Sequence, residues 1–140
     1  MLNEIMEAIA IKINSVFGDD YEIYRDTVQQ GLKEPCFFIG ILKPEITPIM
    51  GNRFIERNPF DIQYFPKKQG DSAELFTVAK KLMLSLDFIT LLDGDQLHGI
   101  YMSYEIIENV LHFFVQYHVS MKKQTEKTYM ETLKQKWGGV

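Results

Sequence analysis

The 140-residue sequence is poor in features that mark whole classes of proteins. It has a single cysteine, Cys36, so no internal disulfide can form, and its place in an apolar run predicts a buried, unreactive thiol. No apolar run approaches the roughly 18 residues of a transmembrane helix. The N-terminus lacks the basic and hydrophobic regions of a signal peptide. We therefore expect a protein made in the cytoplasm.

Positive charge is also scarce. Lysine and arginine number 15 against 19 aspartates and glutamates, which gives a formal net charge of −4. Proteins that bind phosphate backbones usually present a basic surface, so nucleic-acid binding is not expected as the main function. The local lysine pairs lie at the edges of expected helices and strands, where solvation explains them: Lys67-Lys68, Lys80-Lys81 and Lys122-Lys123.

Catalytic and cofactor-binding motifs are missing as well. The turn Asp93-Gly94-Asp95 lacks the later ligands of a calcium loop. His112 and His118 share a strand face roughly 20 Å apart, too far to bind one ion. A contact between Glu105 and His112 across two strands is favoured over an acid–base dyad. We expect no enzyme activity, no cofactor and no metal site.

The strongest pattern that is present is a β-hairpin over residues 98–121, folded at Glu108-Asn109. One of its faces is apolar throughout and is expected in the core: Ile100, Met102, Tyr104 and Ile106 opposite Tyr117, Val115, Phe113 and Leu111. The other face pairs Tyr101 with Gln116 and Ser103 with Phe114. It is less polar than a solvated face, so we expect it to meet a helix of this chain or another protein.

Two amphipathic helices accompany the strands. The first runs from residue 2 to 17, with Asn3 as its cap and Gly18 at its end. The second begins with a capping box of Asp71 and Glu74 and extends to Leu86. Further strands are expected over three segments: 21–24, 36–42 and 59–65.

These elements predict an α+β fold, a mostly antiparallel sheet with a long C-terminal β-hairpin, covered by two amphipathic helices. Residues 1–122 form the single domain, and residues 123–140 are a C-terminal extension, either a short helix or a flexible tail. The connection over residues 43–58 is long for a compact domain and mixes charged with apolar side chains. Gly51-Asn52 could turn it into a protruding hairpin. Connections of this length are usually either functional or disordered, and its apolar residues favour the functional interpretation.

Three sequence segments together indicate one family. They are residues 30–39 (QGLKEPCFFI), residues 58–66 (NPFDIQYFP) and the hairpin over residues 99–121. In this order, after an N-terminal helix, they resemble the tail terminator proteins of long-tailed bacteriophages and their prophages. The resemblance covers residues 1–122 and brings no catalytic residues with it.

The resemblance implies a structural protein of the virion tail, assembled in the bacterial host cytoplasm. Its partners would be copies of itself in a hexameric ring, the tail tube protein and the head–tail connector protein. DNA would pass through the ring without being bound specifically, and no membrane would be involved. The interface residues that we expect lie in the long connection and on the hairpin: Lys43, Glu45, Arg53, Phe54, Glu56, Arg57, Tyr101 and Phe114.

Two other functions remain open. A head-closure or neck adaptor protein shares the small size and the ring habit of a tail terminator. A small nucleic-acid-binding domain or enzyme would use the hairpin as its platform. Aromatic residues on strands can stack bases, but the hairpin faces carry almost no lysine or arginine, which favours packing.

Overall fold

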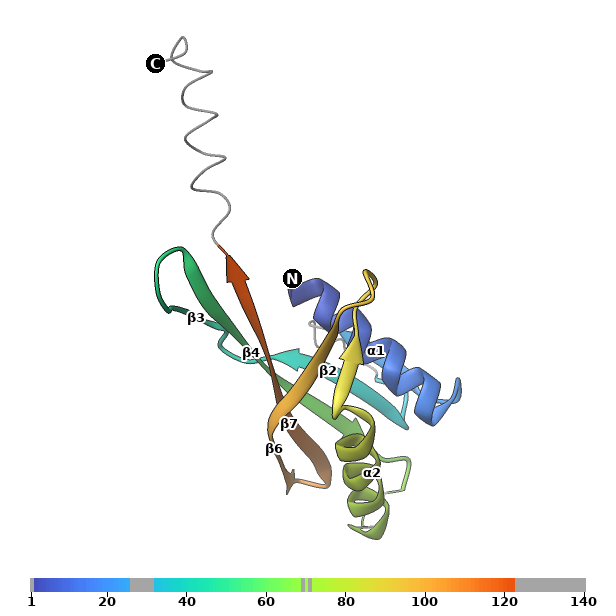
Figure 1. Ribbon diagram of the computed structural model, residues 1–140. Coiled ribbons are helices and arrows are strands. Elements are labelled where there is room, and N and C mark those ends of the chain that lie inside the picture. The colour runs from blue at the N-terminus through green and yellow to red at the C-terminus, as the bar shows by residue number, and fades with distance from the viewer. Residues whose placement is uncertain (1, 26–31, 69, 71, 123–140) are drawn as a thin grey trace, which may run out of the picture.

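The computed structural model describes residues 2–25, 32–68, 70 and 72–122 (Figure 1). The elements follow in the order α1 (Leu2–Phe17), β1 (Glu22–Arg25), β2 (Cys36–Ile41), β3 (Glu45–Pro48), β4 (Arg53–Phe65), α2 (Ser72–Ser85), β5 (Phe88–Thr90), β6 (Gln96–Ile107) and β7 (Val110–Lys122). The expected cap Asp71, the first two residues of the segment 30–39 and the extension 123–140 lie outside the described residues.

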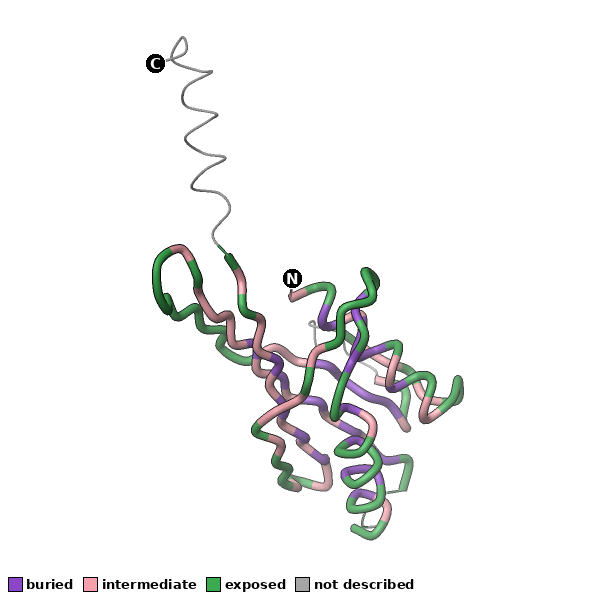
Figure 2. Tube along the Cα trace, viewed as in Figure 1, coloured by how far each residue is buried: buried purple, intermediate pink, exposed green. Residues whose placement is uncertain are grey.

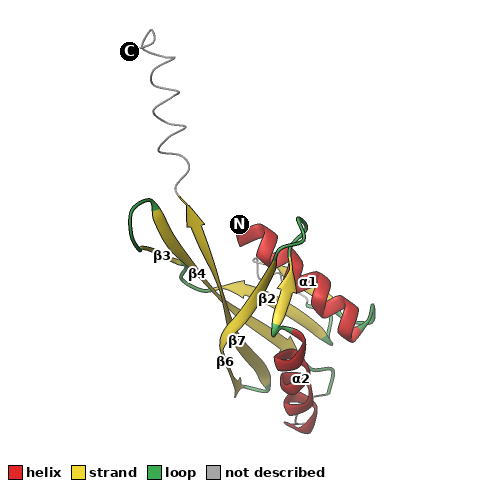
Figure 3. Ribbon diagram, in the orientation of Figure 1, coloured by secondary structure: helices red, strands yellow, loops and turns green. Residues whose placement is uncertain are grey.

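The strands form one mostly antiparallel sheet, as predicted. Within the described residues the strand order is β1-β2-β4-β7-β6-β5, and β3 pairs with the first part of β4 (Figure 3). The pairing of β1 with β2 is parallel, and the others are antiparallel. The long strand β7 therefore lies in the middle of the sheet, between β4 and β6.

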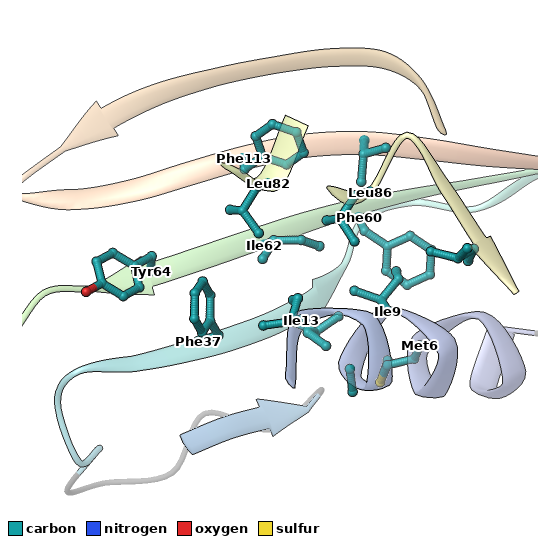
Figure 4. Packing of buried hydrophobic residues seen from close by; sticks show 14 of the residues in the cluster. Met6, Ile9, Ile13, Phe37, Phe60, Ile62, Tyr64, Leu82, Leu86 and Phe113 are labelled. Atoms are coloured by element: carbon teal, nitrogen blue, oxygen red, sulfur yellow. The ribbon is translucent and has the colours of Figure 1, made fainter. Parts of the chain in front are cut away.

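Both helices cover the same face of the sheet. α1 buries Ile5, Ile9 and Ile13, and α2 buries Leu75 and Leu82. Against them pack the alternate side chains of the central strands, several of which Figure 4 shows: Phe37, Ile39, Phe60, Ile62, Tyr64, Leu111, Phe113, Val115 and Tyr117. Burying one such large apolar side chain contributes roughly 1.5–3 kcal/mol to stability. The core face predicted for the strand at 110–117 is confirmed, and in β4 the buried side chains are Phe60, Ile62 and Tyr64.

The first helix ends as its sequence predicts. Gly18 has φ +93° and donates its N–H to the carbonyl of Asn14 at 2.9 Å, which closes the last turn. The expected cap differs, because α1 already begins at Leu2, one residue before Asn3. Asn3 therefore lies inside the first turn and is not the residue that precedes it.

The hairpin of β6 and β7 turns at the predicted residues. Glu108 and Asn109 have φ of 49° and 63°, as a two-residue turn of the mirror-image type requires, and Ile107 lies opposite Val110. Farther from the turn the predicted register is wrong. Gln116 lies opposite Ile100, and a β-bulge separates Ile100 from Ser103. The bulge inserts one residue that a strict alternation of side chains does not anticipate.

Two short strands were not expected from the sequence. β3 falls within the connection expected over residues 43–58. Pro44 precedes it and Pro48 is its last residue, and it pairs with β4 along one side only, where proline is tolerated. β4 accordingly starts at Arg53, six residues before the predicted start. The three-residue strand β5 pairs with the beginning of β6 and is too short for periodicity to reveal.

Candidate interaction surfaces

A three-stranded arm extends past the part of the sheet that the helices cover (Figure 1). It consists of β3, residues 53–57 of β4 and residues 118–122 of β7, and we call it the arm. Its tip turns through Gly51, at φ +65°, where Ile49 and Arg53 are joined by a backbone hydrogen bond of 2.9 Å. The predicted protruding hairpin is thus present, with β7 added as a third strand.

β3 and most of the tip of the arm are exposed, most of its residues in β4 and β7 are half-buried, and the fully buried residues belong to the body (Figure 2). Met50 at the tip is 79% exposed and Ile49 is 54% exposed. Large apolar side chains exposed to this degree at the end of a projection are typical of a surface that a partner covers.

The two faces of the arm differ in chemistry because side chains alternate along each strand. The face that continues the helix-covered side carries Phe54 opposite Met121, and Glu56 between Ile46 and Val119. The other face carries Arg53 opposite Lys122, and Arg57 between Glu45 and His118. We call the second one the charged face of the arm.

The predicted interface residues are distributed accordingly. Arg53, Arg57 and Glu45 gather on the charged face, whereas Phe54 and Glu56 lie on the opposite face. Lys43 is exposed in the short segment that leads from β2 into the arm. The remaining two, Tyr101 and Phe114, lie on the body.

The cations of the charged face have no ion-pair partner within the described residues, where the ion pairs are Arg25 with Glu7 and His112 with Asp61. Arg57 donates a hydrogen bond from Nη1 to Oγ1 of Thr47 instead. Like charges directly opposite each other on neighbouring strands repel. Glu45 lies opposite Arg57 without forming an ion pair in the described residues, so the charged face carries three cations, Arg53, Arg57 and Lys122, against one carboxylate.

Tyr101 and Phe114 lie on the side of the sheet that carries no helix among the described residues. Tyr101 forms the bulge with φ 54°, is 72% exposed, and places its ring centroid 5.9 Å from that of His118. Phe114 is half-buried between Ser103 on β6 and Asp61 on β4. No helix of the described part of the chain covers this face, so that expectation is not met. The alternative, that another protein covers it, stays a prediction.

The electrostatics of this uncovered face depend on neighbouring strands. Glu105 lies opposite His112, as predicted, but the side-chain contact of His112 is made elsewhere: its Nδ1 lies 3.1 Å from Oδ2 of Asp61 on β4. At the root of the arm, burial and then the positive charge of Arg57 lower the pKa of His118. Its Nε2 lies 2.9 Å from Oε1 of Gln116.

Sequence reasoning missed a second polar cluster at the other end of the molecule. Four carboxylates line a notch of about 240 Å³, which we call the acidic notch, together with a single lysine and a proline: Asp19, Asp20, Glu22, Glu34, Lys33 and Pro35. They come from the segment after α1, from β1 and from the approach to β2. No local spacing signals the cluster, because it forms only when β1 pairs with β2.

Sequence reasoning also misplaced Tyr104. It was expected in the core, but it lies near the edge of the sheet and is 47% exposed. Its ring meets that of Phe76 on α2 edge-on, with centroids 6.3 Å apart. Phe76 is itself 50% exposed.

Two further properties bear on the class of protein. Within the described ranges, no helix has the length and apolar character needed to cross a membrane. In the same ranges, no three side chains of histidine, cysteine, aspartate or glutamate gather as metal ligands would.

Comparison with known families identifies the family of this chain. The model of a family described as phage tail terminator protein matches residues 4–129, which is most of the chain. The chain belongs to the phage tail terminator family. No curated protein matches it. Phage tail terminators are structural proteins of the virion tail that associate with other tail components, so the exposed arm and the uncovered sheet face are the surfaces to examine for such contacts.

Proposed function

We propose that copies of this tail terminator assemble into a hexameric ring at the head-proximal end of the tail tube. The ring stops polymerisation of the tube protein and joins the tube to the head–tail connector protein. Assembly takes place in the host cytoplasm, and DNA passes through the ring without specific binding. The family match supports the terminator role, and the arm, which projects from the body with unpaired charges, supports a role in assembly.

The mechanism is occupation of a surface and not chemistry. A closed ring requires that one patch of each copy meet a different patch of its neighbour. The arm is one such patch, and the uncovered face around Tyr101 and Phe114 is a separate surface that each copy offers to other tail components. Once the ring is bound to the last layer of the tube, it covers the surface to which further tube subunits would bind.

The arm can make both apolar and charged contacts. Its apolar tip and Phe54 gain free energy when water is displaced, on the order of 1.5–3 kcal/mol for each large side chain that becomes fully buried. The charged residues Arg53, Glu56 and Arg57 add orientation and steer the encounter, as charges at interfaces do. Lys43 and Glu45 extend the polar surface at the base of the arm.

The test is capping of tubes assembled in vitro from purified tube protein, with lengths measured by electron microscopy. The double variant Arg53→Glu, Arg57→Glu should fold normally but fail to limit tube length. The matched control Lys80→Glu, Lys81→Glu reverses two exposed cations on α2 and should cap as the wild type does.

The outcome separates the proposed function from its rivals. Normal capping by the folded arm variant would contradict the role of the arm. A wild-type chain that binds the head–tail connector protein but leaves tube length unlimited would favour a head-closure adaptor. Binding of DNA at physiological salt would favour the nucleic-acid-binding alternative.

A further inference from the structure

We propose that the charged face of the arm of one copy docks into the acidic notch of a second copy. The inference rests on the proposed function, because the second copy is the neighbour in the ring. It adds which surface of each copy makes the contact and what chemistry holds it. The occupant of the notch is thus another molecule of this chain, presenting Arg53, Arg57 and Lys122.

The arm supplies the positive partner. Arg53 lies directly opposite Lys122, both are exposed, and neither makes an ion pair within the described residues. Arg57 projects from the same face, four residues farther along β4. Two cations held side by side repel each other in the isolated copy, and a carboxylate placed between them removes the repulsion. The arm is therefore suited to an acidic surface.

The notch supplies the negative partner. Its four carboxylates are exposed and face a single lysine, Lys33. Arg25, the arginine of the adjacent strand, is engaged with Glu7 at 3.3 Å. The pKa of the neighbouring Cys36 thiol is raised to about 11, first by burial and then by the negative charges of Glu34 and Glu22. The carboxylates of the notch thus remain largely uncompensated.

The two surfaces lie at opposite ends of the molecule. In Figure 1 the arm projects at the upper left, whereas α1 runs from the N-terminus toward the right and ends at the segment that lines the notch. A contact between opposite ends is heterologous: each copy uses its arm on one neighbour and its notch on the other. Such contacts close into rings or continue as helices, but they do not stop at a two-fold dimer.

Reciprocal charge reversal tests the contact. The arm variant Arg53→Glu, Arg57→Glu carries a negative arm and a negative notch. The notch variant Glu22→Arg, Glu34→Arg carries a positive arm and a positive notch. Each alone should remain monomeric in sedimentation velocity at low salt, where the wild-type full chain associates.

An equimolar mixture of the two variants should associate again. Each arm then meets a notch of opposite sign, so that the copies alternate around the assembly. Increasing salt should weaken both this mixture and the wild type, because screening acts on exposed charges. The control Lys80→Glu, Lys81→Glu should associate as the wild type does, and circular dichroism establishes that every variant is folded.

Three results would overturn the inference: association of the notch variant at the wild-type level, failure of the mixture to associate, or a wild-type chain that stays monomeric at low salt. Tube capping separates this inference from the proposed function. A notch variant that associates and caps normally would remove the inference alone. Association through arm and notch by a chain that never caps tubes would remove the terminator function and keep the inference.

Discussion

The hydroxyl of Tyr117 in the central strand β7 donates a hydrogen bond of 2.7 Å to the backbone carbonyl of Leu86, directly after α2. Both residues are fully buried, so the bond ties the end of the helix to the middle of the sheet. Burial, followed by the charge of Asp87, raises the pKa of Tyr117, which keeps the hydroxyl protonated as a donor.

Removing this hydroxyl should destabilise the fold. The substitution Tyr117→Phe leaves the buried carbonyl of Leu86 without its donor, which costs about 1–3 kcal/mol in the free energy of unfolding. Urea titration followed by circular dichroism measures the change. Tyr104→Phe is the control, because the half-exposed Tyr104 should lose little. Equal stabilities of Tyr117→Phe and wild type would contradict the structural role of the bond.

The close approach of β6 to the carbonyl group of Leu86 requires glycine at position 99. A Cβ atom at this position would lie 2.5 Å from the carbonyl oxygen of Leu86 and 2.9 Å from Cγ2 of Val115. Gly99→Ala therefore should lower the free energy of unfolding by about 1–3 kcal/mol, the usual cost of overpacking. Gly40→Ala, where the nearest atom lies 3.3 Å away on the ring of Phe38, should cost less. The reverse order in thermal denaturation would show that β6 does not approach Leu86 so closely.

The turn of the β6–β7 hairpin carries strain that a substitution can relieve. Glu108 adopts φ 49°, a left-handed conformation that costs most residues roughly 1–2 kcal/mol and asparagine less. Glu108→Asn should therefore raise the free energy of unfolding by up to about 1 kcal/mol. Glu105→Asn, in the regular part of β6, should bring no such gain. A lower melting temperature for Glu108→Asn would contradict the turn geometry.

Stability should depend on pH through His118. Its folded pKa lies below the ordinary value of 6.5, because it is partly buried and lies near Arg57. The unfolded chain then binds more protons, so the contribution of His118 is complete above 6.5 and is lost as the pH falls below that value and through the lower folded pKa. The difference in melting temperature between about pH 8 and pH 5 should shrink in His118→Gln. His98→Gln controls for the loss of an imidazole, and an unchanged difference in His118→Gln would refute the shift.

Hydrophobic periodicity predicted most of the helices and strands. Alternation along residues 110–117 identified the core side of β7 correctly, and helical spacing identified both helices. The bulge at Tyr101 could not be predicted in this way. It inserts one residue without changing composition, and every assignment on the N-terminal side of it then shifts to the other face.

The candidate surfaces were predictable only where their signal is local. The turn residues Gly51-Asn52 indicated a projecting hairpin, and the arm is present. That β7 adds a third strand to the arm depends on pairing across the fold, as does the choice of Asp61 over Glu105 by His112. The acidic notch joins separate segments, so neither spacing nor composition could reveal it.

The terminator function itself is tested most directly by tail length. Lysates of the parent phage or prophage, with and without this gene, should be compared by electron microscopy, and the gene should then be restored in trans. We expect overlong tubes unattached to heads when the gene is absent and normal tails when it is restored. Tails of normal length in the absence of the gene, whether or not they join heads, would contradict the assignment.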